Sequence, residues 1–204
     1  MIPLRPPLIL ASRSPRRAEM LGKAGVQVRV RPADLDDGVL RPGRVPPEQW
    51  VAALAWFKAR RVAERAQDAG EALSGTIMAA DTICAHGEEL LGQPRDRAEA
   101  RRMIHRLRGA VHRTITGVCF FDPRSSRRVL LVDAATVRMG PVSDDAVEAY
   151  LDSDQWRGKA GAYNLAERVE AGWRIACEGD PATVMGLPMR RLGPLFAGLR
   201  SPQA

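Results

Sequence analysis

The stretch LILASRSPRR, residues 8–17, decides the fold class of this chain. Its first four residues are apolar and predict a short strand, and helix signals follow at once. Pro15 suits the first helical position and Ser14 suits the N-cap, so we expect a helix to about Lys23, before Gly25. A strand that passes through a tight turn into a helix is typical of an α/β protein.

Strand and helix signals keep alternating along the rest of the chain. The patterns predict further strands at 26–30, 76–85, 90–91 and 173–177, and further helices at 47–68, 97–107, 143–151 and 188–199. Two β-rich segments between 111 and 139 flank a turn at 122–125 and predict one long antiparallel hairpin. We therefore expect an α/β fold with a mixed sheet, in a single domain over residues 1–204.

The composition is that of a globular protein with an excess of positive charge. The 204 residues include 31 Lys and Arg against 24 Asp and Glu, a net charge of +7. Only three of the cations are lysines, and the arginines are scattered over the whole chain rather than gathered in one basic segment. A dedicated nucleic-acid surface is therefore not expected, whereas phosphate remains a plausible partner.

No sequence feature indicates a membrane or an oxidising compartment. The apolar run before residue 11 is too short for a signal peptide, and no window is apolar enough to span a bilayer. Cys84, Cys119 and Cys177 are far apart in apolar surroundings, which favours reduced core thiols in a cytoplasmic protein. The three histidines lack partners at the spacing of a structural zinc site.

The turn at residues 12–17 is the first candidate for chemistry. The start of a helix presents free backbone N–H groups and can hold an anion. Arg16 and Arg17 lie in the first turn, where the helix dipole favours acids, so an anion there would offset them. An ordinary cap with exposed arginines is the alternative.

Lys58 is the second candidate, because it interrupts an apolar helix face. Val51, Leu54, Ala55 and Val62 form a stripe at helical spacing, and Lys58 falls in its middle. A lysine on the core-facing side either extends its amino group to the surface or reaches a partner or a cleft.

Asp81 is the third candidate and the most informative. It lies in a strand that is otherwise apolar apart from threonines, and a buried carboxylate requires a partner, a metal or a catalytic role. Asp36 and Asp37, in the loop after the second strand, could meet it around a divalent cation. A solvated loop is the alternative for these two residues.

Short motifs follow one another in a fixed order along residues 8–199. They are residues 10–17, Lys58-Ala59, Ala80-Asp81-Thr82, Gly92-Gln93-Pro94, Asp96 with Glu99-Ala100, Gly109, His112, Thr116-Gly117, Lys159-Ala160-Gly161-Ala162-Tyr163 and Gly186-Leu187-Pro188. In order and spacing they resemble the Maf family of nucleoside triphosphate pyrophosphatases.

This resemblance implies a mixed α/β sheet bent around a deep cleft, similar to that of the inosine triphosphatases. It implies cleavage of a nucleoside triphosphate between its α and β phosphates with a divalent cation, Mg²⁺, Mn²⁺ or Co²⁺, to remove unwanted nucleotides. It also suggests a homodimer, and neither a membrane nor a stable nucleic-acid partner is expected.

The matching positions imply individual roles. Ser12, Arg16 and Lys58 would hold the triphosphate, and Asp36 would help to bind the metal. Asp81 would be the base that activates water and would also contact the metal. Because a solvated aspartate is a weak base, burial or the metal must assist it.

Two departures from the family pattern affect the function. Gln93 stands where the family usually has a lysine, so Arg95 or another arginine must substitute, or triphosphate affinity is lower. Asn164-Leu165-Ala166-Glu167 replaces Gly-Ile-Gln-Gly in a stretch expected to line the base end of the cleft. The motifs resemble the dTTP and UTP branch more than the 7-methyl-GTP branch, but the 164–167 stretch fits neither, and the base stays unassigned.

Two other functions remain as alternatives. The loss of a phosphate-binding cation at Gln93 favours a non-catalytic nucleotide-binding regulator of cell division. A nucleic-acid-binding protein would instead bind DNA or RNA with a steep dependence on salt.

Overall fold

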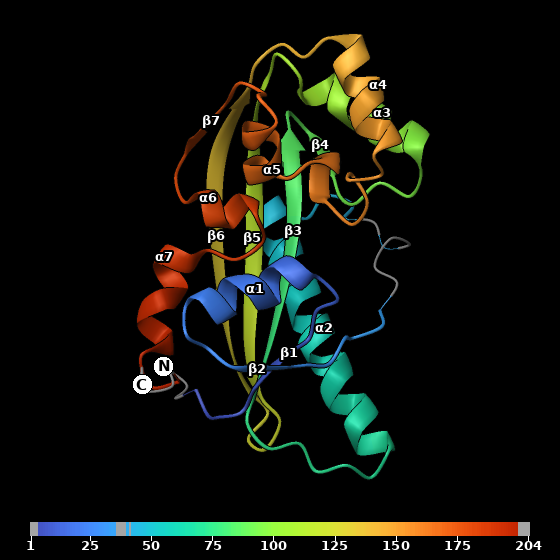
Figure 1. The fold of residues 1–204 in the computed structure, drawn as a ribbon. Coiled ribbons are helices and arrows are strands. Elements are labelled where there is room, and N and C mark those ends of the chain that lie inside the picture. Colours follow the sequence, from blue (N-terminus) through green and yellow to red (C-terminus); the bar gives the residue numbers. More distant parts are fainter. Residues whose placement is uncertain (1–3, 36–39, 41, 200–204) are drawn as a thin grey trace.

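The computed structural model describes residues 4–35, 40 and 42–199. Within these residues one mixed seven-stranded sheet runs in the order β2-β1-β3-β5-β6-β7, and β4 pairs with β3 at its side (Figure 1). The strands are β1 (Leu8–Leu10), β2 (Val28–Val30), β3 (Thr76–His86), β4 (Glu89–Leu91), β5 (Val111–Asp122), β6 (Arg127–Met139) and β7 (Ile175–Glu178).

The fold is α/β, as expected, but the sheet contains more antiparallel strand pairs than the one hairpin that the sequence predicted. β1 pairs in parallel with β2 and with β3. β3 pairs antiparallel with both β4 and β5, and β5–β6 and β6–β7 are also antiparallel. The partner of a strand is not encoded in its own pattern, which is why only the hairpin was predictable.

Helices cover both faces of the sheet. They are α1 (Pro15–Lys23), α2 (Pro47–Asp68), α3 (Arg97–Leu107), α4 (Asp144–Asp152), α5 (Leu165–Glu170), α6 (Pro181–Val184) and α7 (Met189–Leu192), with short 3₁₀ turns at Ala160–Ala162 and Gly193–Phe196. Figure 1 shows α1 in front of the strands and α2 behind them.

The alternation of side chains along β1 explains how one strand packs against helices on both faces of the sheet. Leu8 and Leu10 are buried in the cluster that includes Leu21 of α1. Ile9, between them, is buried in the cluster that includes Ala55 of α2. Successive side chains of a strand point to opposite faces, so each helix covers its own half of the core.

Gly117 in the middle of β5 allows α2 to approach the sheet closely. A Cβ atom there would lie 2.6 Å from the carbonyl carbon and oxygen of Val51 in α2. Gly117 is also the register partner of Asp81 on β3. The close approach therefore brings the helix that carries Lys58 to the strand that carries Asp81.

Some predicted boundaries were wrong. β2 begins at Val28 and β7 covers Ile175–Glu178. The predicted last helix is split into α7 and the Gly193–Phe196 turn, because Pro194 lacks the N–H that a continuous helix needs. Ser14 occupies the N-cap position of α1, but its side chain makes no capping hydrogen bond. None of the helices in the described part of the chain is long and apolar enough to cross a membrane.

Candidate active site

Lys58 and Asp81 form an ion pair between α2 and β3. Lys58 Nζ donates a hydrogen bond to Asp81 Oδ1 over 2.5 Å, and the two side chains are only 16% and 9% exposed. Lys58 therefore reaches a partner in a cleft, as one prediction had it. The alternative, that its amino group extends to the surface, is wrong. The sequence predicted both residues as candidates but did not predict their contact.

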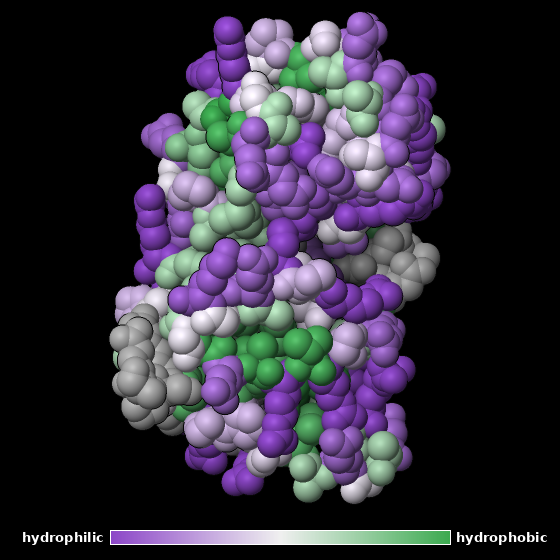
Figure 2. Space-filling view, in the orientation of Figure 1, coloured by the Kyte–Doolittle hydropathy of each residue, from purple (hydrophilic) through white to green (hydrophobic). Residues whose placement is uncertain are grey.

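Adjoining cavities open from this pair. A small one of about 50 Å³ is lined by Lys58, Asp81, Arg16 and Gln93, among others. A larger one of about 530 Å³ adds Ser12 and is bordered by the start of α1. In the space-filling view, hydrophilic side chains surround the hollow beside α1 (Figure 2). The structure thus brings together every predicted site residue within its described part.

Arg17 fixes the start of α1, a role that the sequence did not distinguish from that of Arg16. Its Nε donates to the carbonyl of Gly186 over 3.0 Å, and its terminal nitrogens donate to Ser12 Oγ and Thr82 Oγ1 over 3.1 and 3.2 Å. Thr82 directly follows Asp81. Arg17 therefore links the helix start to the strand that carries the buried carboxylate.

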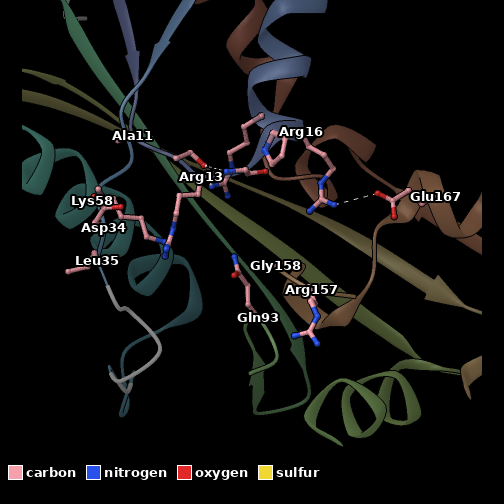
Figure 3. Close-up of a pocket in the computed structure, with 15 residues that line it drawn as sticks. Ala11, Arg13, Arg16, Asp34, Leu35, Lys58, Gln93, Arg157, Gly158 and Glu167 are labelled. Carbon is pink, nitrogen blue, oxygen red and sulfur yellow. Dashed lines mark hydrogen bonds and ion pairs between the residues drawn. The ribbon is translucent and has the colours of Figure 1, made fainter. Parts of the chain in front are cut away.

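Arg16 instead contacts an acid on the opposite wall. Its Nη1 lies 3.5 Å from Glu167 Oε1, as the dashed line in Figure 3 marks. The other carboxylate oxygen of Glu167 accepts a short hydrogen bond from Lys159 Nζ. Burial lowers the pKa of Lys159, and the hydrogen bond and charge of Glu167 oppose this decrease. The carboxylate of Glu167, at the cavity wall, thus pairs with both Arg16 and Lys159.

The position of Glu167 follows from the 164–167 stretch that departs from the family pattern. Asn164 Oδ1 accepts the N–H of Glu167 over 3.0 Å and caps α5. Glu167 therefore stands in the first turn, beside Arg16. The sequence assigned this stretch to the base end of the cleft, whereas its acid contacts a residue that the resemblance assigned to the triphosphate. The sequence reasoning did not single out Glu167, but the departure of residues 164–167 from the family pattern could have indicated it.

Gln93 lies between two arginines that the sequence reasoning did not single out. Figure 3 shows the side chains of Arg13 and Arg157 on either side of Gln93, and all three line the cavity of about 530 Å³. Arg95, the substitute named from the sequence, uses its Nε to bond Glu99 Oε2 over 3.0 Å. Arg13 is therefore better placed than Arg95 to replace a cation at Gln93, whereas Arg157 is itself paired with Asp154 over 3.0 Å.

Comparison with known proteins identifies the family of this chain. The family model described as Maf-like protein matches residues 7–199. This chain belongs to the Maf family.

Relatives of this Maf protein carry a functional name. A protein of Salinibacter ruber named dTTP/UTP pyrophosphatase is 38% identical over 194 residues, which is 94% of this chain and 90% of that protein. Proteins with the same name from Chelativorans sp. and Anaeromyxobacter dehalogenans are 36% and 38% identical, covering 93% and 95% of this chain and 90% and 94% of theirs.

Several motifs that match the Maf pattern hold the walls of the site in place, and Tyr163 and Gly186 among them also line the small cavity. Asp96 caps α3 by accepting the N–H of Glu99 over 2.7 Å. A buried hydrogen bond of 2.7 Å joins His112 Nε2 to Tyr163 Oη. Gly186 adopts a φ of +105°, which disfavours other residues, and its carbonyl accepts from Arg17. These residues fix the walls on which the charged groups stand.

The side chains at the site suit a divalent cation only in part. In residues 4–35, 40 and 42–199, no group of three or more His, Cys, Asp or Glu side chains converges. Mg²⁺, however, is commonly held by one or two carboxylates together with substrate phosphates, and the carboxylate of Asp81 is such a ligand. Asp36, the second predicted metal residue, lies outside the described residues, as does Asp37.

Proposed function

We propose that this Maf protein hydrolyses dTTP and UTP to the monophosphate and pyrophosphate, with a divalent cation and with Asp81 as the base. As a member of this family, the chain is an enzyme, a nucleoside triphosphate pyrophosphatase, and the relatives compared above are named dTTP/UTP pyrophosphatase. The observation that carries the proposal is the Lys58–Asp81 pair in the wall of a cavity that Arg16 and Arg17 also line.

The chain's own cations would hold the triphosphate. Arg16 and Lys58 line the cavity, and the start of α1 adds backbone N–H groups with their partial positive charge. Ser12 Oγ accepts the N–H of Ser14 over 3.2 Å, which fixes the turn that precedes the helix. An ammonium group has three N–H donors, so Lys58 can contact Asp81 and a phosphate oxygen together.

Asp81 is suited to accept a proton from water. Lys58 holds Oδ1 in place, and the strand backbone limits movement of the carboxylate. A water molecule that transfers its proton to Asp81 attacks phosphorus while the bond between the α and β phosphates breaks in line. A bound Mg²⁺, Mn²⁺ or Co²⁺ would neutralise phosphate charge there, and Asp81 together with Asp36 would hold it.

A panel of triphosphates tests this proposal. Pyrophosphate release is measured for dTTP, UTP, the other natural triphosphates and modified ones, each with Mg²⁺, Mn²⁺ or Co²⁺. We expect turnover of dTTP and UTP that stops with a chelator and falls at least a hundredfold in Asp81→Asn. Full activity of Asp81→Asn would remove Asp81 as the base.

One observation favours a second function, a non-catalytic nucleotide-binding regulator of cell division. Gln93 places a neutral amide in the cavity wall where the family usually has a lysine. In that case calorimetry would detect triphosphate binding, while the panel would detect no pyrophosphate release. A nucleic-acid binder would give neither result but would shift DNA or RNA in gels at low salt.

The predictions of the cellular compartment, the domain organisation and the oligomeric state of the enzyme stay proposals. The cytoplasm suits a protein whose three cysteines are all free thiols. A single domain over residues 1–204 and a homodimer are proposed from the family, and size-exclusion chromatography with light scattering measures the latter.

A further inference from the structure

Arg13 occupies a distinctive place at the candidate site. It lines the cavity of about 530 Å³ and also a neighbouring one of about 710 Å³ that contains Asp81. Its side chain is exposed and points into the space between Lys58 and Gln93 (Figure 3). Asp34, Leu35 and Gln93 also line both cavities, so an extended ligand that spans them would lie beside Arg13.

The turn that carries Arg13 is held rigidly on both sides. Ser12 is 7% exposed, and its hydroxyl accepts from the N–H of Ser14 and from Arg17. α1 begins directly afterwards, at Pro15. Because its neighbours are fixed, the Arg13 side chain projects from a stable base at the positive end of a helix.

The other cavity arginines already have partners. Arg16 contacts Glu167, and Arg17 donates to Gly186, Ser12 and Thr82. Arg157 lies 3.0 Å from Asp154 Oδ1 and stacks on Trp156 at 4.4 Å.

The surroundings leave the charge of Arg13 available to a ligand. Within the described ranges, no ion pair or hydrogen bond engages the Arg13 side chain. The carboxylate of Asp34, in the same wall, pairs instead with Arg65. Gln93, across the cavity, is neutral.

We propose that Arg13 is a substrate-binding residue that contacts the phosphate chain and supplies the positive charge that Gln93 does not. This inference rests on the proposed function. Its guanidinium offers a planar set of N–H donors that matches phosphate oxygens. Arg13 acts on affinity rather than on the chemical step, because it does not touch Asp81.

The test compares Arg13→Gln with Arg157→Gln, which removes the same charge from the same cavity but from a paired arginine. We expect KM for dTTP to rise about tenfold in Arg13→Gln, corresponding to about 1.4 kcal/mol, with kcat within twofold. Arg157→Gln should change KM less than threefold. Introducing Gln93→Arg into Arg13→Gln should restore most of the lost affinity.

Binding by calorimetry separates this inference from the proposed function. The probes are the α,β-methylene analogue of dTTP and inorganic tripolyphosphate, each at two salt concentrations. Arg13→Gln should weaken both by a similar factor and reduce the salt dependence. A wild-type protein that binds the analogue but releases no pyrophosphate refutes the proposed hydrolysis alone.

Three outcomes would overturn the role of Arg13. One is unchanged affinity for both probes in Arg13→Gln, and another is a larger loss in Arg157→Gln. The third is a loss for the nucleotide analogue without a loss for tripolyphosphate, because Arg13 would then contact the nucleoside. Circular dichroism and Tm show that each variant is folded, and Arg13→Lys provides a milder second substitution.

Discussion

Lys58 Nζ and Asp81 Oδ1 lie 2.5 Å apart and join the central helix α2 to the central strand β3. Both side chains are almost buried, so each charge helps to compensate the other. The candidate base and a candidate phosphate ligand are therefore one coupled unit.

This coupling predicts non-additive kinetics. Asp81→Asn should lower kcat at least a hundredfold, and Lys58→Met should raise KM and also lower kcat, because it releases the Asp81 carboxylate. The double variant should lose far less than the product of the two single losses. Steady-state kinetics of the four proteins check this. Fully multiplicative losses would mean that the two residues act independently.

Gln93→Lys should tighten substrate binding. A new cation would stand in the cavity wall beside Arg13 and Arg157. We expect KM for dTTP to fall about threefold to tenfold, with little change in kcat. Gln67→Lys adds the same charge to an exposed position in α2 outside these cavities and should change nothing. An unchanged KM in Gln93→Lys would show that phosphate does not pass this wall.

Glu167→Gln should also lower KM, because the carboxylate of Glu167 competes with phosphate for Arg16. We expect about a threefold to tenfold decrease, strongest at low salt. Tm should fall as well, since the nearly buried Lys159 loses its charged partner. Glu170→Gln removes the same charge from the exposed end of α5 and is the control. A higher KM in Glu167→Gln would mean that Glu167 positions Arg16 for substrate instead.

Gly117→Ala should destabilise the protein and impair catalysis together. The added Cβ would collide with the backbone of Val51, so α2 must move away from the sheet. Overpacking of this kind lowers the free energy of unfolding by about 3 kcal/mol. Urea unfolding and kcat measure the two effects. Gly22→Ala, in α1 where a Cβ meets nothing within 4 Å, should be neutral or slightly stabilising.

Stability should fall in mild acid because of His112. Burial lowers the pKa of His112 to about 4 from its usual 6.5. The unfolded chain therefore binds a proton between pH 6.5 and 4 that the folded protein does not, and acid favours unfolding. The free energy of unfolding should be highest above pH 6.5 and decrease by up to about 3 kcal/mol toward pH 4, because a tenfold change in proton affinity corresponds to about 1.4 kcal/mol.

Urea unfolding at several pH values, for the wild type and for His112→Gln, measures this contribution. The variant should be less stable at neutral pH, since glutamine fills the site less well, but its stability should depend less on pH over this range. Equal slopes in both proteins would show that other groups dominate the acid sensitivity.

The sequence by itself determined the local elements and the identity of the charged candidates. Apolar spacing and helix-start residues act within a few positions, so β1, α1, α2 and the β5–β6 hairpin could be predicted. Lys58 and Asp81 stood out because charge on an apolar face is costly wherever it lies.

Only the tertiary structure decided how these charges are paired. The contacts of Lys58 with Asp81, Arg16 with Glu167 and Arg17 with Gly186 join segments far apart in the chain. No local pattern encodes such partners, because strand order and the approach of α2 at Gly117 set them. The sequence therefore determined which residues carry charge, and the fold determined which of those charges face the cavity.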